Sequence, residues 1–146
     1  MVRARRKRMF REKALAGVCA TDALILFTCP VIGLDPQEFC RDLDNRNLQP
    51  QIAASKSAQA ELTASVDKNK ALEFKDRQAL HDLLRKAEAL QHAADYYAGT
   101  LSYAKRFQCQ SATALTQMQE ALEDYHAAAK HWTVEARRHL EELAGQ

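Results

Sequence analysis

Residues 80–143 read LHDLLRKAEALQHAADYYAGTLSYAKRFQCQSATALTQMQEALEDYHAAAKHWTVEARRHLEEL. Along this stretch, apolar and small side chains recur at alternating intervals of three and four residues, from Leu80 to Leu143. Those intervals match the 3.6-residue turn of an α-helix and place the side chains on one side of it. The pattern is typical of a coiled coil or a long amphipathic helix.

The composition around this stretch also favours helix. Residues 51–146 contain no proline, 21 alanines, and only the glycines Gly99 and Gly145. A second row beside the first recurs every seven residues: Phe107, Ala114, Ala121 and Ala128. Three apolar positions in seven favour packing in a bundle. We expect an all-α fold, a long helical hairpin or coiled coil, with an N-terminal apolar segment packed on it or anchoring it.

Gly99 leaves two shapes open. If Ala98-Gly99-Thr100 ends one helix and begins the next, the chain folds back there as an antiparallel hairpin. If Gly99 is tolerated within a helix, at a cost of about 1 kcal/mol relative to alanine, the helix continues, and the unbroken 3-4 spacing supports this. We favour the hairpin, because a continuous rod would need another chain to cover its apolar side. A further bend or break is expected at residues 67–70.

Three zones are predicted along the chain. Residues 1–34 form a basic tip and an apolar segment, residues 35–50 a short linker helix and turn, and residues 51–146 the long helical domain. In the linker, Asp35 is placed to cap a helix that has Pro36 at its first position and Glu38 at its third. We therefore expect a short helix from Pro36 to about Leu43, followed by a turn.

Positive charge gathers at the start of the chain. Residues 1–13 carry a net charge of +6, whereas the remaining residues carry −4. Such a tip suits phosphate or lipid head groups, through salt-dependent contacts that do not read sequence. A solvated terminus is the alternative. The candidate residues for contact with nucleic acid or an anionic membrane surface are Arg3, Arg5, Arg6, Lys7, Arg8, Arg11 and Lys13.

Residues 14–34, ALAGVCATDALILFTCPVIGL, resemble a membrane anchor that follows cations. Their nine Leu, Ile, Val and Phe side chains favour insertion by about 3 to 5 kcal/mol in total, and Asp22 opposes it by up to about 3 kcal/mol. The balance leaves three alternatives: a helix buried against the domain, which we favour, a membrane anchor, or a cleaved or imported signal.

The four cysteines, Cys19, Cys29, Cys40 and Cys109, are too few and too scattered for a disulfide-stapled miniprotein. We expect reduced thiols that pack in the fold. The chain has no C-x-x-C pair, so neither a zinc knuckle nor a thioredoxin-type site is predicted.

Catalytic chemistry has little support. His131, Glu135 and His139 share a helical face, but the two histidines lie about 12 Å apart along the axis, too far to bind one metal ion. Surface ion pairs are the better interpretation. Glu123 and His126 match one E-x-x-H step of a di-iron bundle, and the second step is missing. We predict no catalytic residue, no metal ligand, no cofactor and no small-molecule substrate.

The leading hypothesis is a non-enzymatic structural or adaptor subunit that self-associates or binds partner helices through its apolar stripe. We expect it to be intracellular, although the first alternative is a single-pass membrane protein that projects a helical arm, and the second is a nucleic-acid or anionic-surface binder. Tyr96 and Tyr103 lie off the stripe and are predicted to form an exposed contact patch at the hairpin tip. The interaction stripe comprises Leu80, Leu83, Leu90, Leu101, Leu115, Met118, Leu122, Tyr125, Trp132 and Leu143.

Overall fold

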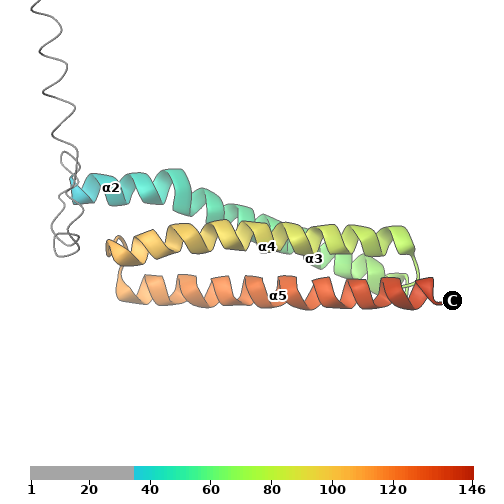
Figure 1. Ribbon diagram of the computed structural model, residues 1–146. Coiled ribbons are helices and arrows are strands. Elements are labelled where there is room, and N and C mark those ends of the chain that lie inside the picture. The colour runs from blue at the N-terminus through green and yellow to red at the C-terminus, as the bar shows by residue number, and fades with distance from the viewer. Residues whose placement is uncertain (1–34) are drawn as a thin grey trace, which may run out of the picture. The chain divides into compact units, whose positions relative to one another are not determined.

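The computed structural model describes residues 35–146 and is helical almost throughout (Figure 1). The elements, in chain order, are α2 (Pro36–Leu43), the π-helical turn η1 (Asp44–Leu48), α3 (Gln49–Ala71), α4 (Arg77–Arg106) and α5 (Ala112–Ala144). Helix α4 packs along both α3 and α5, and short turns reverse the chain between them. The all-α class predicted from the sequence is confirmed, with three long helices rather than two.

Helix α2 begins and ends where the sequence predicts. The Asp35 carboxylate accepts a hydrogen bond from the backbone N–H of Gln37 at 3.1 Å, and Pro36 occupies the first turn. The turn expected after Leu43 does not form. Instead η1 carries the helix on into α3, whose first turn contains Pro50. Because proline lacks an N–H and crowds the preceding helical turn, a wider π-turn just before Pro50 accommodates it.

Helix α3 ends slightly later than predicted, after Ala71. Glu73 adopts a left-handed backbone with φ 53°, and the N–H of Phe74 reaches back to the carbonyl of Asn69 at 2.8 Å. This is a Schellman ending, in which a left-handed residue lets two N–H groups bond the last helical carbonyls. Asp76 then caps α4 by accepting from the N–H of Ala79 at 2.7 Å. The turn thus spans residues 72–76.

The hairpin predicted at Gly99 is wrong, because α4 passes through Gly99 and ends at Arg106. The second reversal is another Schellman ending: Gln108 has φ 52°, and the N–H of Cys109 bonds the carbonyl of Ala104 at 2.9 Å. Ser111 caps α5 by accepting from the N–H of Ala114 at 3.2 Å. Gln108 and Ser111, two of the polar residues within the 3-4 pattern, therefore belong to a turn rather than to a helix seam.

The core is built mainly on α4. Eight of its ten buried residues follow the predicted spacing and are almost fully inaccessible: Leu80, Leu83, Ala87, Leu90, Ala94, Tyr97, Leu101 and Ala104. Helix α3 contributes Leu62 and Val66 and also several buried polar residues. Among these, Asn69 donates from Nδ2 to the carbonyls of Ser65 at 2.9 Å and Ala79 at 3.0 Å. This amide ties the end of α3 to the start of α4.

Aromatic packing joins the α3–α4 turn to α5. The ring of Phe74 stacks on His139 with centroids 4.5 Å apart and lies nearly parallel to Trp132 at 6.4 Å. Phe74 also has a left-handed backbone, with φ 55°, and this conformation is uncommon for a bulky residue. The turn therefore serves as a cover for the C-terminal half of α5.

Cys40 and Cys109 form a disulfide with a Cα–Cα separation of 5.0 Å, which corrects the expectation of reduced thiols for this pair. The bond joins α2 to the α4–α5 turn across 69 residues of sequence. Beside it the rings of Phe39 and Phe107 meet edge to face, 4.9 Å apart. Sequence spacing missed the pair because only the fold brings these two positions together. Cys19 and Cys29 lie outside the described residues.

Tyr97 gives the bundle a predicted sensitivity to alkali. Its hydroxyl donates to the backbone carbonyl of Met118 at 3.2 Å, and burial raises its pKa to about 12. Since an unfolded tyrosine ionises near pH 10, the unfolded state loses its proton first as pH rises. The stabilisation is complete below pH 10 and lost between pH 10 and about 12, an effect of about 2–3 kcal/mol.

Denaturant unfolding at pH 9, 10, 11 and 12 would measure this loss. The variant Tyr97→Phe should show a flatter profile over that interval. Some slope will remain, because burial also raises the pKa of Tyr125. Equal slopes in the variant and the wild type would contradict the role of Tyr97.

Candidate docking surface

Most of the predicted interaction stripe lies inside the bundle. Six of its ten residues are buried: Leu80, Leu83, Leu90, Leu101, Leu122 and Tyr125. The other four lie on α5 and are half-buried: Leu115, Met118, Trp132 and Leu143. A partner could reach the first six only by opening the bundle. The exposed large apolar side chains of the described residues lie outside the stripe.

The opposite side of α4 carries exposed aromatic side chains. Tyr96 and Tyr103 are 72% and 55% exposed, as the sequence predicts, although they lie within a continuous helix and not at a hairpin tip. They belong to a second series with 3-4 spacing, and every member of it is exposed and uncharged. This neutral face of α4 comprises Ala89, His92, Tyr96, Gly99 and Tyr103.

Two charged side chains beside the neutral face contact α5. Asp95 Oδ1 lies 3.0 Å from His126 Nε2, and Glu88 Oε1 lies 3.6 Å from Arg137. These contacts cross between α4 and α5 at partly exposed positions, where an ion pair contributes about 0 to 1 kcal/mol. Both carboxylates therefore lie along the edge of the neutral face that is nearer to α5.

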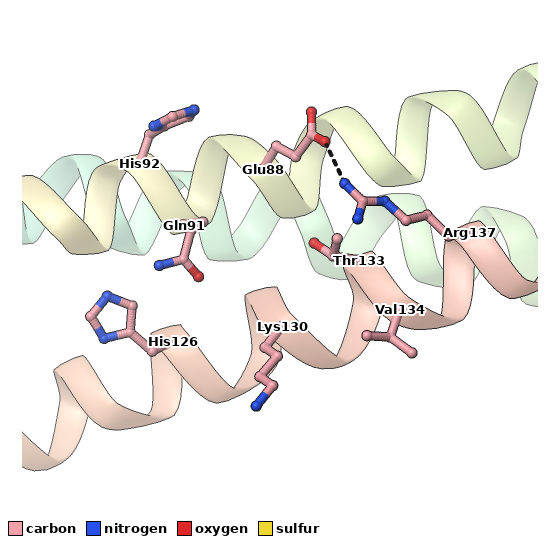
Figure 2. A pocket seen from close by; sticks show the side chains of 8 residues that line it. All are labelled: Glu88, Gln91, His92, His126, Lys130, Thr133, Val134 and Arg137. Atoms are coloured by element: carbon pink, nitrogen blue, oxygen red, sulfur yellow. Dashed lines mark ion pairs between the residues drawn. The ribbon is translucent and has the colours of Figure 1, made fainter.

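An open groove of about 510 Å³ runs between α4 and α5 beside this face (Figure 2). Figure 2 shows Arg137 of α5 reaching across to Glu88 of α4. His92 lines the groove and also belongs to the neutral face, so the two surfaces are continuous. The complete lining is Glu88, Gln91, His92, His126, Lys130, Thr133, Val134 and Arg137.

Of the predicted histidine clusters, Glu135, His139 and His126 make exposed side-chain contacts, whereas His131 lies edge to face against Trp132. Glu135 bonds Arg138 at 2.7 Å, and this hydrogen bond to the guanidinium lowers the pKa of the carboxyl. His139 contacts Glu142 at 3.2 Å as well as the Phe74 ring. His126 contacts Asp95 instead of pairing with Glu123. Within residues 35–146, no three His, Cys, Asp or Glu side chains are grouped so that they could hold a metal ion.

The cationic tip and the apolar segment fall outside the described residues. Arg3, Arg5, Arg6, Lys7, Arg8, Arg11 and Lys13 therefore stay predicted contacts, as does the membrane anchor at residues 14–34. From residue 35 onward, no helix combines the length and apolar character needed to cross a membrane.

Comparison with known proteins found no counterpart. No protein-family model, no curated protein and no solved structure matches this chain. The function is therefore inferred from the side chains and contacts described above.

Proposed function

We propose that this chain is a non-enzymatic helical structural or adaptor subunit that binds a partner protein through the neutral face of α4. The observation that carries the proposal is the exposure of Tyr96 and Tyr103, at 72% and 55%, on a helix whose opposite side is fully buried. Tyrosine is enriched at protein interfaces because its large ring gives contact area and its hydroxyl tolerates water.

The spacing of the neutral face also supports a helical partner. Its members recur at three- and four-residue intervals, so they form a straight seam along α4. A helix laid along that seam would contact each of them in turn. The bundle supplies a rigid support, because the buried side of α4 packs on both α3 and α5.

The test is a paired substitution at the two tyrosines. In the cell where the protein is native, Tyr96→Gln/Tyr103→Gln should reduce the amount of chain found in a larger complex on a native gel by at least about tenfold. Leu72→Gln is the matched control, since Leu72 is an apolar side chain of the α3–α4 turn that is 40% exposed and lies outside the neutral face and the groove. Equal loss in both variants, or loss in neither, would argue against the neutral face as the docking surface.

A second candidate function is a membrane-anchored arm that projects into an oxidising compartment. The Cys40–Cys109 disulfide favours it, because structural disulfides persist outside the reducing cytosol. The order of the chain agrees: cations precede the apolar residues 14–34, and the helical domain follows them. By the positive-inside tendency, an anchor in this order places the domain on the non-cytoplasmic side.

Alkaline-carbonate fractionation of native cells, with thiols alkylated at lysis, tests this candidate. The arm requires that the chain stay in the membrane pellet and that Cys40 and Cys109 resist alkylation until a reductant is added. Release into the supernatant would contradict the membrane anchor. Alkylation of Cys40 and Cys109 without reductant would contradict an oxidising compartment.

A further inference from the structure

We infer that the partner on the neutral face of α4 is a second copy of this chain, paired antiparallel so that Tyr96 of each copy sits against Gly99 of the other. This inference rests on the docking role proposed above and names the partner. It begins from Gly99, a glycine in the interior of a 30-residue helix. Glycine in a helix interior lowers helix stability relative to alanine. A glycine at such a position therefore suggests a role that a larger side chain could not fill.

No neighbour among residues 35–146 explains the glycine. A Cβ built at Gly99 would meet nothing within 4 Å, and the position is exposed. The missing side chain therefore leaves open space on the outer surface, between the exposed Tyr96 and Tyr103. Space of that kind lets a large side chain or a second backbone approach closely from outside.

The second copy supplies a side chain that fits this space. In antiparallel helix pairs, large and small side chains interlock when they face each other across the seam. Setting Tyr96 opposite Gly99 of the other copy also sets Gly99 opposite the other Tyr96, by two-fold symmetry. The same register places His92 opposite Tyr103. Tyr96, Gly99, His92 and Tyr103 then each face another member of the neutral face.

Charge complementarity selects the antiparallel direction. Glu88 borders the neutral face at its N-terminal end, and its carboxylate stays about half exposed beside Arg137. Arg106, with its guanidinium 5.7 Å from the Phe107 ring centroid, borders the face at the other end. In the register above, Arg106 falls opposite Ala89, next to Glu88 of the other copy. A parallel pair would bring Glu88 to Glu88 and Arg106 to Arg106, and would leave both Gly99 positions facing each other across a gap.

Sedimentation equilibrium of the oxidised full-length chain measures the pairing. We expect a reversible dimer with a Kd in the micromolar range, because a single helix pair buries less than about 1,200 Å² in total. Gly99→Gln should raise the Kd at least tenfold while the thermal midpoint does not fall. Leu72→Gln should leave the Kd unchanged, because Leu72 lies outside the neutral face and the groove. Equal Kd values for the two variants, or a monomer up to about 1 mM, would overturn the inference.

The direction has its own test. Arg106→Glu should raise the Kd a few-fold, and the exchange Glu88→Arg/Arg106→Glu should restore it. A parallel pair predicts no change from the single variant, so that result would overturn the antiparallel arrangement. If the purified chain is monomeric while Tyr96→Gln/Tyr103→Gln still removes the native complex, the second-copy inference fails and the proposed docking function stands. If neither assay responds, both fail.

Discussion

Replacing both bridged cysteines, Cys40→Ser/Cys109→Ser, is expected to lower the free energy of unfolding by about 4 kcal/mol. The estimate follows from the 69-residue separation, since the bond restricts the unfolded chain in proportion to the logarithm of the loop it closes. Within the folded chain, α2 depends on the bond, because none of its eight residues is buried. Guanidinium unfolding followed by far-ultraviolet circular dichroism, with and without dithiothreitol, measures the change.

The double variant also separates this bond from the other cysteines. Dithiothreitol should destabilise the wild type by nearly as much as the substitutions do, and should leave the variant unchanged. A reductant effect that persists in the variant would assign the stabilisation to Cys19 or Cys29. If the variant unfolds at the same denaturant concentration as the oxidised wild type, the bond does not stabilise the fold.

The helices could be predicted from the sequence because their signals are local. The 3-4 spacing identified the buried side of α4 and the packed side of α5, and Asp35 with Pro36 located the start of α2. These features depend on side chains a few residues apart, which a single sequence displays directly. Because these signals are local, they correctly predicted the all-α class. They did not predict the number of long helices, which depends on where the turns occur.

The turns were misplaced because both use left-handed residues other than glycine. Glu73 and Gln108 adopt φ near 53°, where glycine is the usual occupant, while Gly99 lies in ordinary helix. Gly99 therefore indicated a helix end at a position where α4 continues. The available signals were the capping residues Asp76 and Ser111, each three residues before the backbone N–H that it accepts from.

The candidate docking surface was only partly predictable. Tyr96 and Tyr103 stand out because they leave the apolar stripe, and their exposure is confirmed. The disulfide and the α4–α5 contacts could not be predicted from the sequence, because they join residues whose separation in space depends on the positions of the turns. His126 and Asp95, for example, are 31 residues apart in sequence. Because α4 continues through Gly99, the residues of the neutral face on either side of it form a single surface.

The variant Leu90→Ala tests the function of the apolar stripe. It is expected to lower the free energy of unfolding by about 3 kcal/mol. Leu90 is fully buried on the central helix, and removing a buried leucine side chain leaves a cavity that costs about 2–5 kcal/mol. Chemical unfolding of the full-length chain provides the measurement. Val134→Ala, at an exposed apolar position on α5, should change stability by less than about 0.5 kcal/mol.

The effects of Leu90→Ala on unfolding and on association distinguish two roles of the stripe, stabilising the bundle and binding a partner. The sequence pattern alone does not distinguish them. If the stripe holds the bundle together, Leu90→Ala weakens folding, and association through the neutral face of α4 weakens only as far as the folded population falls. If the stripe instead binds partners, Leu90→Ala weakens association and leaves unfolding near the wild-type value. The burial of Leu90 between α4 and its neighbours predicts the first outcome. Because Tyr96→Gln/Tyr103→Gln is expected to do the reverse, the two variants together assign one side of α4 to folding and the other to docking.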